Sequence, residues 1–94
     1  MNKTEAMQIV EAELETFRSK PYSELVALVD AEPTIGQKFG PSGKEYQFEI
    51  MVYWDDKPDG DVRVIGSVDD GGWRAYFPMG TSFIKAPDNT FIGE

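Results

Sequence analysis

The chain has 94 residues, a formal net charge of −8 at pH 7, 40% hydrophobic residues, and neither cysteine nor histidine. This length and apolar content predict one domain over residues 1–94, with a helical part over 2–30 and a sheet part over 34–93. The composition excludes disulfides, nucleophile sites that need cysteine or histidine, and zinc sites that use either residue.

The same features predict location and partners. A surface of this charge repels phosphate backbones and anionic lipid, so we expect neither nucleic-acid nor membrane binding. The sequence contains no run of about 18 apolar residues, and "MNKTEAMQIV" lacks the apolar core of a signal peptide. Absence of cysteine suits a reducing compartment. We therefore expect a soluble cytoplasmic protein without cofactor or metal, whose partner is another protein or a second copy.

Residues 2–19 are predicted to form an amphipathic helix. Its apolar stripe recurs at spacings of three and four and consists of Met7, Val10, Leu14 and Phe17. Asn2 followed by Glu5 has the spacing of a capping box, which begins a helix at Asn2. Pro21 breaks a helix interior but suits a first turn, so a second short helix is expected over 21–30.

From residue 34 the apolar period changes to two, which is typical of strands with one buried face. The predicted strands are "KEYQFEIMVYW" (44–54), "DVRVIGSV" (61–68), "WRAYFPM" (73–79) and the short Ser82–Lys85, with an earlier strand before residue 40. The predicted fold class is α+β: one or two N-terminal helices packed on one face of an antiparallel meander of four or five strands.

The acidic stretch "WDDKPDGDVRV", residues 54–64, has three competing explanations: a calcium loop, an acidic catalytic site, or a turn. A calcium loop beginning at Asp55 would have Lys57 at a ligand position and Gly66 where glutamate belongs. "GPSGKE" likewise lacks the first glycine and the Ser/Thr of a phosphate loop. We interpret residues 54–64 as a turn between two strands.

Pro58-Asp59-Gly60 is predicted to make this turn, with glycine in the left-handed position of a bulge. That turn would pair Lys57 with Asp61, Tyr53 with Ile65, and Val52 with Gly66. Gly66 would then leave room for an aromatic neighbour.

The other turns are predicted at residues 40–43, 70–71 and 87–89. The first would pair Phe39 with Lys44. The second would pair Asp69 with Gly72 and set Trp73 beside Val68, so that strand 73–79 becomes the next neighbour in the sheet.

Paired carboxylates are the remaining catalytic candidates. Glu49 with Asp55 or Asp69 would supply the two acids of a glycosidase. However, Trp54 and Trp73 fall on the predicted buried face, and a two-layer fold of this size rarely encloses a cleft. We expect no enzyme and no catalytic residue.

The candidate interaction surface is the exposed face of the sheet, where aromatic, methionine and arginine side chains gather as they do in protein interfaces. Its expected residues are Met51, Tyr53, Ile65 and Tyr76, with Arg63 and Arg74 at the rim. The leading hypothesis is a small acidic, non-enzymatic protein-interaction domain that uses this face, and one concrete form of it is an inhibitor or immunity-type protein with a basic partner. The alternatives are a homodimeric structural domain that uses the same face, and a carboxylate-based small hydrolase or ligand-binding domain.

Overall fold

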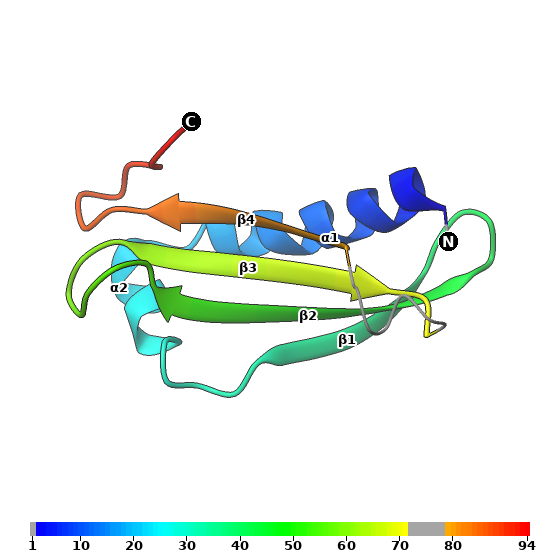
Figure 1. Ribbon diagram of the computed structural model, residues 1–94, viewed down its shortest axis with the longest axis horizontal. Helices are drawn as coiled ribbons and strands as arrows, with labels where there is room; N and C mark the ends of the chain where they lie inside the picture. Colours follow the sequence, from blue (N-terminus) through cyan, green and yellow to red (C-terminus); the bar gives the residue numbers. More distant parts are fainter. Residues whose placement is uncertain (1, 72–78) are drawn as a thin grey trace.

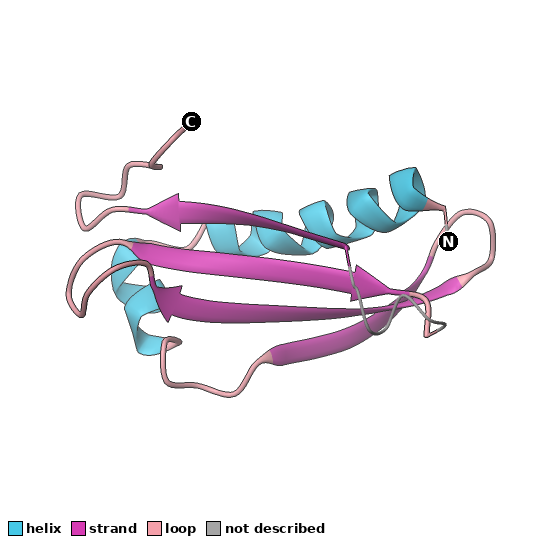
Figure 2. Ribbon diagram, in the orientation of Figure 1, coloured by secondary structure: helices cyan, strands magenta, loops and turns pink. Residues whose placement is uncertain are grey.

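The computed structural model describes residues 2–71 and 79–94 of the chain. Its elements, labelled in Figure 1, are α1 (Lys3–Arg18), α2 (Tyr22–Ala27), β1 (Thr34–Phe39), β2 (Glu45–Trp54), β3 (Val62–Asp69) and β4 (Met79–Lys85). The strands form one antiparallel sheet in the order β1-β2-β3-β4. Both helices lie on one face of it, with α1 packed mainly against β3 and β4 (Figure 2). The predicted α+β fold, a helical layer on an antiparallel meander, is confirmed.

α1 begins where the sequence predicts. The side-chain oxygen of Asn2 accepts the backbone N–H of Glu5 at 3.0 Å, which satisfies one of the free donors of the first turn. The buried side of the helix carries Glu5, Ala6, Val10, Leu14 and Phe17. The capping-box expectation is wrong for the Glu5 carboxylate, because Ser42 and Tyr46 bind it instead.

α2 is shorter than the predicted range 21–30 and has only six residues. Pro21 takes the N-cap position, where its missing N–H leaves no hydrogen bond unmade. Leu25 is the buried residue of this helix. The hydroxyl of Tyr22 donates to the carbonyl of Gly60 at 2.7 Å and so ties α2 to the loop between β2 and β3.

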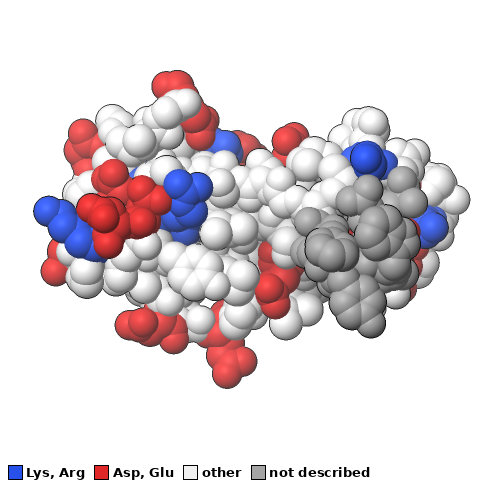
Figure 3. Space-filling view, in the orientation of Figure 1, with Lys and Arg blue, Asp and Glu red and all other residues white. Residues whose placement is uncertain are grey.

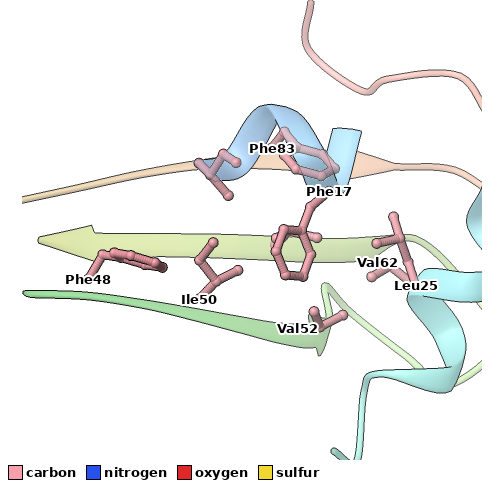
Figure 4. Close-up of a cluster of buried hydrophobic side chains, with 9 residues drawn as sticks. Phe17, Leu25, Phe48, Ile50, Val52, Val62 and Phe83 are labelled. Carbon is pink, nitrogen blue, oxygen red and sulfur yellow. The ribbon is translucent and has the colours of Figure 1, made fainter. Parts of the chain in front are cut away.

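The core fills the space between the helices and the inner face of the sheet, where every second residue of β2 and β3 is buried. Figure 4 shows Phe17 and Leu25 from the two helices meeting side chains from three strands. The full cluster is Leu14, Phe17, Leu25, Phe48, Ile50, Val52, Val62, Val64 and Phe83. Burial of each large side chain of this kind stabilises the fold by about 1.5–3 kcal/mol.

Gly66 lies at a close approach between α1 and β3. A Cβ atom at this position would lie 2.8 Å from Val10 Cγ2 and 3.1 Å from Leu14 Cγ. Interiors packed at crystal-like density have no room for such contacts. The space above Gly66 therefore belongs to the helix, and the expectation of an aromatic neighbour is wrong.

Lys85 projects from β4 into the protein and is only 5% exposed. Its Nζ donates to the carbonyl oxygens of Arg18 and Lys20, each at 2.8 Å. The last carbonyls of a helix have no partner within the helix, and a cation complements the negative end of its dipole. The ammonium also lies 4.8 Å from the ring centroid of Phe91. β4 thus caps the C-terminus of α1.

The hairpin that joins β1 and β2 differs from the predicted register by one residue. Phe39 lies opposite Glu45 and not opposite Lys44. Gly43 adopts a φ of +86°, and its N–H bonds to the carbonyl of Gly40 at 2.9 Å. Glycine in the left-handed conformation adds one residue to the loop and shifts the pairing.

The β2–β3 register differs from the predicted one by two residues. Val52 lies opposite Val64 and not opposite Gly66. Because successive side chains alternate between the two faces, an even shift leaves each of them on its predicted face. The burial pattern of β2 and β3 therefore follows the predicted alternation in spite of the shift.

The loop over residues 56–60 explains the shift. The N–H of Asp55 bonds to the carbonyl of Asp61 at 2.9 Å, so the hairpin closes two residues earlier on β2 than predicted. Asp59, and not Gly60, takes the positive φ, at 68°. Aspartate tolerates this conformation better than most residues do. The prediction that the acidic stretch is a turn holds, but its left-handed residue was assigned wrongly.

The second neighbour of β3 is β4. Val68 lies opposite Met79, so the predicted pairing of Val68 with Trp73 is wrong. The predicted strand over 82–85 is confirmed as the second half of β4. Residues 72–78, with most of the predicted strand 73–79 and the predicted partner of Asp69, lie outside the described residues.

The predicted turn at 87–89 is confirmed. Asn89 takes a φ of +72°, and the chain reverses so that the N–H of Ile92 bonds to the carbonyl of Ile84 at 2.9 Å. The segment after β4 therefore lies along the edge of that strand and does not cross the helix-free face of the sheet (Figure 1).

Candidate interaction surface

The candidate site lies on the outer face of the sheet, which is the face turned away from the helices. The structure places there the predicted residues Met51, Tyr53, Arg63 and Ile65. Met51 lies opposite Ile65, and Tyr53 lies opposite Arg63, whereas the predicted register paired Tyr53 with Ile65. The predicted site residues Tyr76 and Arg74 fall outside the described residues.

Two isoleucines that the sequence interpretation missed extend this surface. Ile84 lies opposite Arg63, and Ile92 lies beside Ile84. Together with Tyr53 they form one row across the sheet, in which Tyr53 is 44% and Ile92 43% exposed. The alternation in β4 carried the signal, because an inward Phe83 requires an outward Ile84. We call Met51, Tyr53, Arg63, Ile65, Ile84 and Ile92 the outer patch.

Arg63 lies across the outer patch and is held at both ends. Its Nε donates to Asp55 Oδ1 at 2.8 Å, and its Nη1 donates to Ser82 Oγ at 3.1 Å. The Tyr53 hydroxyl lies 2.9 Å from Met51 Sδ. These contacts fix the polar atoms of the patch and leave its apolar atoms facing outward.

Carboxylates gather at one end of the outer patch. Figure 3 looks onto this face and shows a central band of uncharged side chains, with acidic groups gathered at the end that carries the β2–β3 loop. That loop contains Asp55, Asp56, Asp59 and Asp61 against a single lysine, Lys57. An excess of negative charge at one end of an apolar surface attracts a partner of opposite charge.

A cavity of about 230 Å³ opens between the α2–β1 connection and β2, and Met51 and Tyr53 of the outer patch are among its lining residues. Its apolar lining includes Phe17, Leu28, Val29, Ile50 and Val52. Glu32 is the acidic residue in this lining. The cavity is large enough for an apolar side chain and lies at the sheet edge, next to the outer patch.

The three carboxylates that the sequence nominated for catalysis do not line this cavity. Glu49 lies on the outer face opposite Ser67, Asp55 is bound to Arg63, and Asp69 accepts the N–H of Gly71 at 2.8 Å. Glu49 therefore lies within the sheet, Asp55 forms an ion pair and Asp69 stabilises a turn.

The pKa values of the Glu5 and Asp88 carboxyl groups are lowered, and neither residue lines the cavity. The backbone N–H of Ser42 lowers the pKa of Glu5, with help from hydrogen bonds that the Tyr46 and Ser42 hydroxyls donate. The hydroxyl and N–H of Thr90 lower the pKa of Asp88 in the turn after β4.

Glu5 has a structural role. It is 6% exposed, and its two oxygens accept hydrogen bonds at 2.7 Å from the Ser42 N–H, the Ser42 hydroxyl and the Tyr46 hydroxyl. A Cβ atom on Gly40 would collide with the Glu5 carboxylate, so glycine is needed where the hairpin passes the helix. Glu5 thereby ties the first turn of α1 to the β1–β2 hairpin.

Glu5→Gln lowers the melting temperature at neutral pH, by roughly 5–10 °C, because an amide cannot accept all three bonds of the carboxylate. The folded-state pKa of Glu5 lies below its ordinary value of 4.5, so its stabilisation is complete above that pH and is lost as the pH falls through the folded pKa. The gap between wild type and variant should therefore narrow below about pH 4.5.

Thermal unfolding from pH 3 to 7 measures this gap, with Glu11→Gln on the exposed side of α1 as the control. A gap that stays constant with pH, or one no larger than that of the control, contradicts the assignment.

Comparison of the chain with protein-family models, with curated proteins and with solved structures finds no match. Among the residues that the structure describes, neither helix combines the length and the apolar character needed to cross a membrane.

Proposed function

We propose that this chain is a non-enzymatic protein-interaction domain that binds a basic partner protein through the outer patch. The observation that carries the proposal is the row of Tyr53, Ile84 and Ile92 across a sheet face that no other described element covers. This surface matches a partner protein, such as the target of an inhibitor, whose contact surface is apolar at its centre and basic around it.

The chemistry of the outer patch supports a protein partner. Tyrosine, methionine and arginine are enriched in interfaces, where an apolar centre is surrounded by polar groups. Arg63 is already bound to Asp55 and Ser82, so it is ordered before a partner arrives. Preordered side chains reduce the entropy that association costs.

The charge of the chain supports a basic partner. The net charge is −8, and the β2–β3 loop adds its aspartates at one end of the outer patch. Complementary charges accelerate encounter and make association fall with ionic strength. The same charge disfavours nucleic acid. The lack of cysteine supports a reducing location, and we propose the cytoplasm.

Tyr53→Ser removes the exposed aromatic ring of the outer patch without changing the charge, and should reduce partner retention about tenfold or more. The test compares tagged wild type, Tyr53→Ser and the helix-face variant Gln8→Ser in native lysate at about 50 and 500 mM salt, across which the screening length shrinks severalfold. Quantitative mass spectrometry identifies the retained proteins.

The expected result is a basic protein that wild type and Gln8→Ser retain at low salt, and that both high salt and Tyr53→Ser release. Thermal unfolding of each variant checks that it is folded. Equal retention by Tyr53→Ser and wild type, or a partner that only Gln8→Ser loses, overturns the proposal.

A further inference from the structure

We propose that two copies of this chain associate through β1, edge to edge and antiparallel, around a two-fold axis at Gln37. The two four-stranded sheets would then join into one continuous sheet. This inference is independent of the proposed function, because it uses the free edge of β1 and not the outer patch.

The backbone of β1 leaves its outer edge unpaired. The Gly40 N–H bonds to the Lys44 carbonyl at 2.9 Å, and antiparallel pairs alternate between bonded and non-bonded, so the even residues of β1 bond to β2. The N–H and C=O groups of the odd residues Ile35, Gln37 and Phe39 therefore point away from the sheet. Across residues 2–71 and 79–94, no hydrogen bond occupies them.

This edge is complementary to itself. With the axis at Gln37, Ile35 of one copy lies opposite Phe39 of the other, and both outward backbone groups of each of these residues find partners. Pro33 and Pro41 flank the segment at equal distances from Gln37. Because proline has no N–H to donate, these two residues end the ladder at matching positions on both copies.

The side chains favour the same register. Ile35 and Phe39 are each 70% exposed, the highest values among the large apolar residues that the structure describes. Directly opposite apolar pairs stabilise antiparallel strands. In the proposed dimer each isoleucine packs against the partner's phenylalanine, on both sides of the axis.

β1 lacks the usual protection of an edge strand. Edges are commonly blocked by proline, by bulges or by an exposed lysine. The lysine in β1, Lys38, is exposed, but its ammonium forms an ion pair with Glu13 of α1, so its charge is held at the helix and not at the free edge. A six-residue strand with two exposed apolar side chains and free backbone groups is a template for pairing.

Ionic strength distinguishes this association from binding of a basic partner. Each copy carries a charge of −8, so the two copies repel one another at low salt. We expect the dimer to become stronger as salt screens this repulsion, whereas binding of a basic partner becomes weaker.

Disulfide trapping tests the register directly, because the natural chain has no cysteine. In the proposed dimer, Gln37→Cys places two cysteines opposite each other with Cα atoms about 5.5 Å apart, within disulfide range. The matched control is Gln47→Cys, which is exposed on the same face of β2 and directly opposite Gln37 within one copy. Its two cysteines would lie too far apart to bond.

The expected result under mild oxidation is cross-linking of Gln37→Cys about tenfold or more faster than of Gln47→Cys, with the difference growing as salt is added. Equal rates for the two variants overturn the proposal.

A second measurement uses proline without cross-linking. Gln37→Pro removes the central edge donor and keeps every bond between β1 and β2, while Gln37→Thr keeps the donor. Edge contacts of this size form weak interfaces, so sedimentation is run at up to about 1 mM protein. Wild type and Gln37→Thr should exceed the monomer mass of 10.6 kDa, and Gln37→Pro should match it. Wild type at the monomer mass throughout contradicts the proposal.

Discussion

Gly66→Val lowers the free energy of unfolding by about 3 kcal/mol, because the added methyl groups enter space that α1 already fills. Even a single Cβ atom would lie 2.8 Å from Val10 Cγ2, so the helix must move away from β3. Valine favours strands, and its propensity alone would stabilise β3. The variant is therefore expected to be less stable, and not more stable, only because the helix lies so close to the sheet at this position. Urea unfolding measures the change.

Ser67→Val is the matched control for this prediction. It places the same residue one position along β3, on the outer face, where we expect a change of less than about 0.5 kcal/mol. The double variant Val10→Ala with Gly66→Val should lose about 1 kcal/mol less stability than the sum of the losses in the two single variants. The reason is that Val10→Ala makes room for the valine at position 66. A loss at Gly66 no larger than the loss at Ser67 would show that α1 does not restrict this position.

Lys85→Met lowers the free energy of unfolding by about 3 kcal/mol. The substitution keeps most of the apolar stem and removes the ammonium that binds the Arg18 and Lys20 carbonyls. Hydrogen bonds to a charged donor are worth about 1.5–3 kcal/mol each, and part of that is regained when water reaches the carbonyls. Urea unfolding gives the loss, and hydrogen exchange in the last turn of α1 should become faster.

Lys38→Met is the control, since it removes a lysine whose ion pair with Glu13 is at the surface. Exposed pairs contribute about 0–1 kcal/mol, so we expect a small change there. If Lys85→Met and Lys38→Met lower the free energy of unfolding equally, then the hydrogen bonds of the buried Lys85 ammonium stabilise the fold no more than a surface ion pair does.

Apolar periodicity predicted the layers of this fold well. The 3.6-residue period over α1 and the two-residue period over β2 and β3 each place side chains on the faces that the structure shows. These periods result from burial, which acts on every residue of an element. A local error therefore does not change the fold class.

Strand register depended on single residues, and there the predictions were wrong. A two-residue slip between β2 and β3 preserves every face, so burial cannot reveal it. The loop between β2 and β3 sets the register, because Asp59 takes the positive φ and Tyr22 binds the Gly60 carbonyl. Tyr22 belongs to α2, which is far away in sequence.

The choice of the strand next to β3 failed for a similar reason. "WRAYFPM" and "MGTSFIK" both alternate, so the pattern does not distinguish them. The outer patch was consequently located with its β2 and β3 residues and without its isoleucines from β4 and the following segment. Lys85 was missed because lysine is rarely buried, and the helix end that binds it is known only from the fold.

The cap that Lys85 places on α1 also affects the order in which the protein forms during synthesis. Lys85 follows Lys20 by 65 residues, which a ribosome adds in roughly 3–13 s at about 5–20 residues per second. A 16-residue helix is marginal on its own in water. α1 leaves the ribosome before the sheet, and it becomes stable only when β3 covers its apolar side and β4 caps its end. α1 is thus made before the two strands that fix it in place.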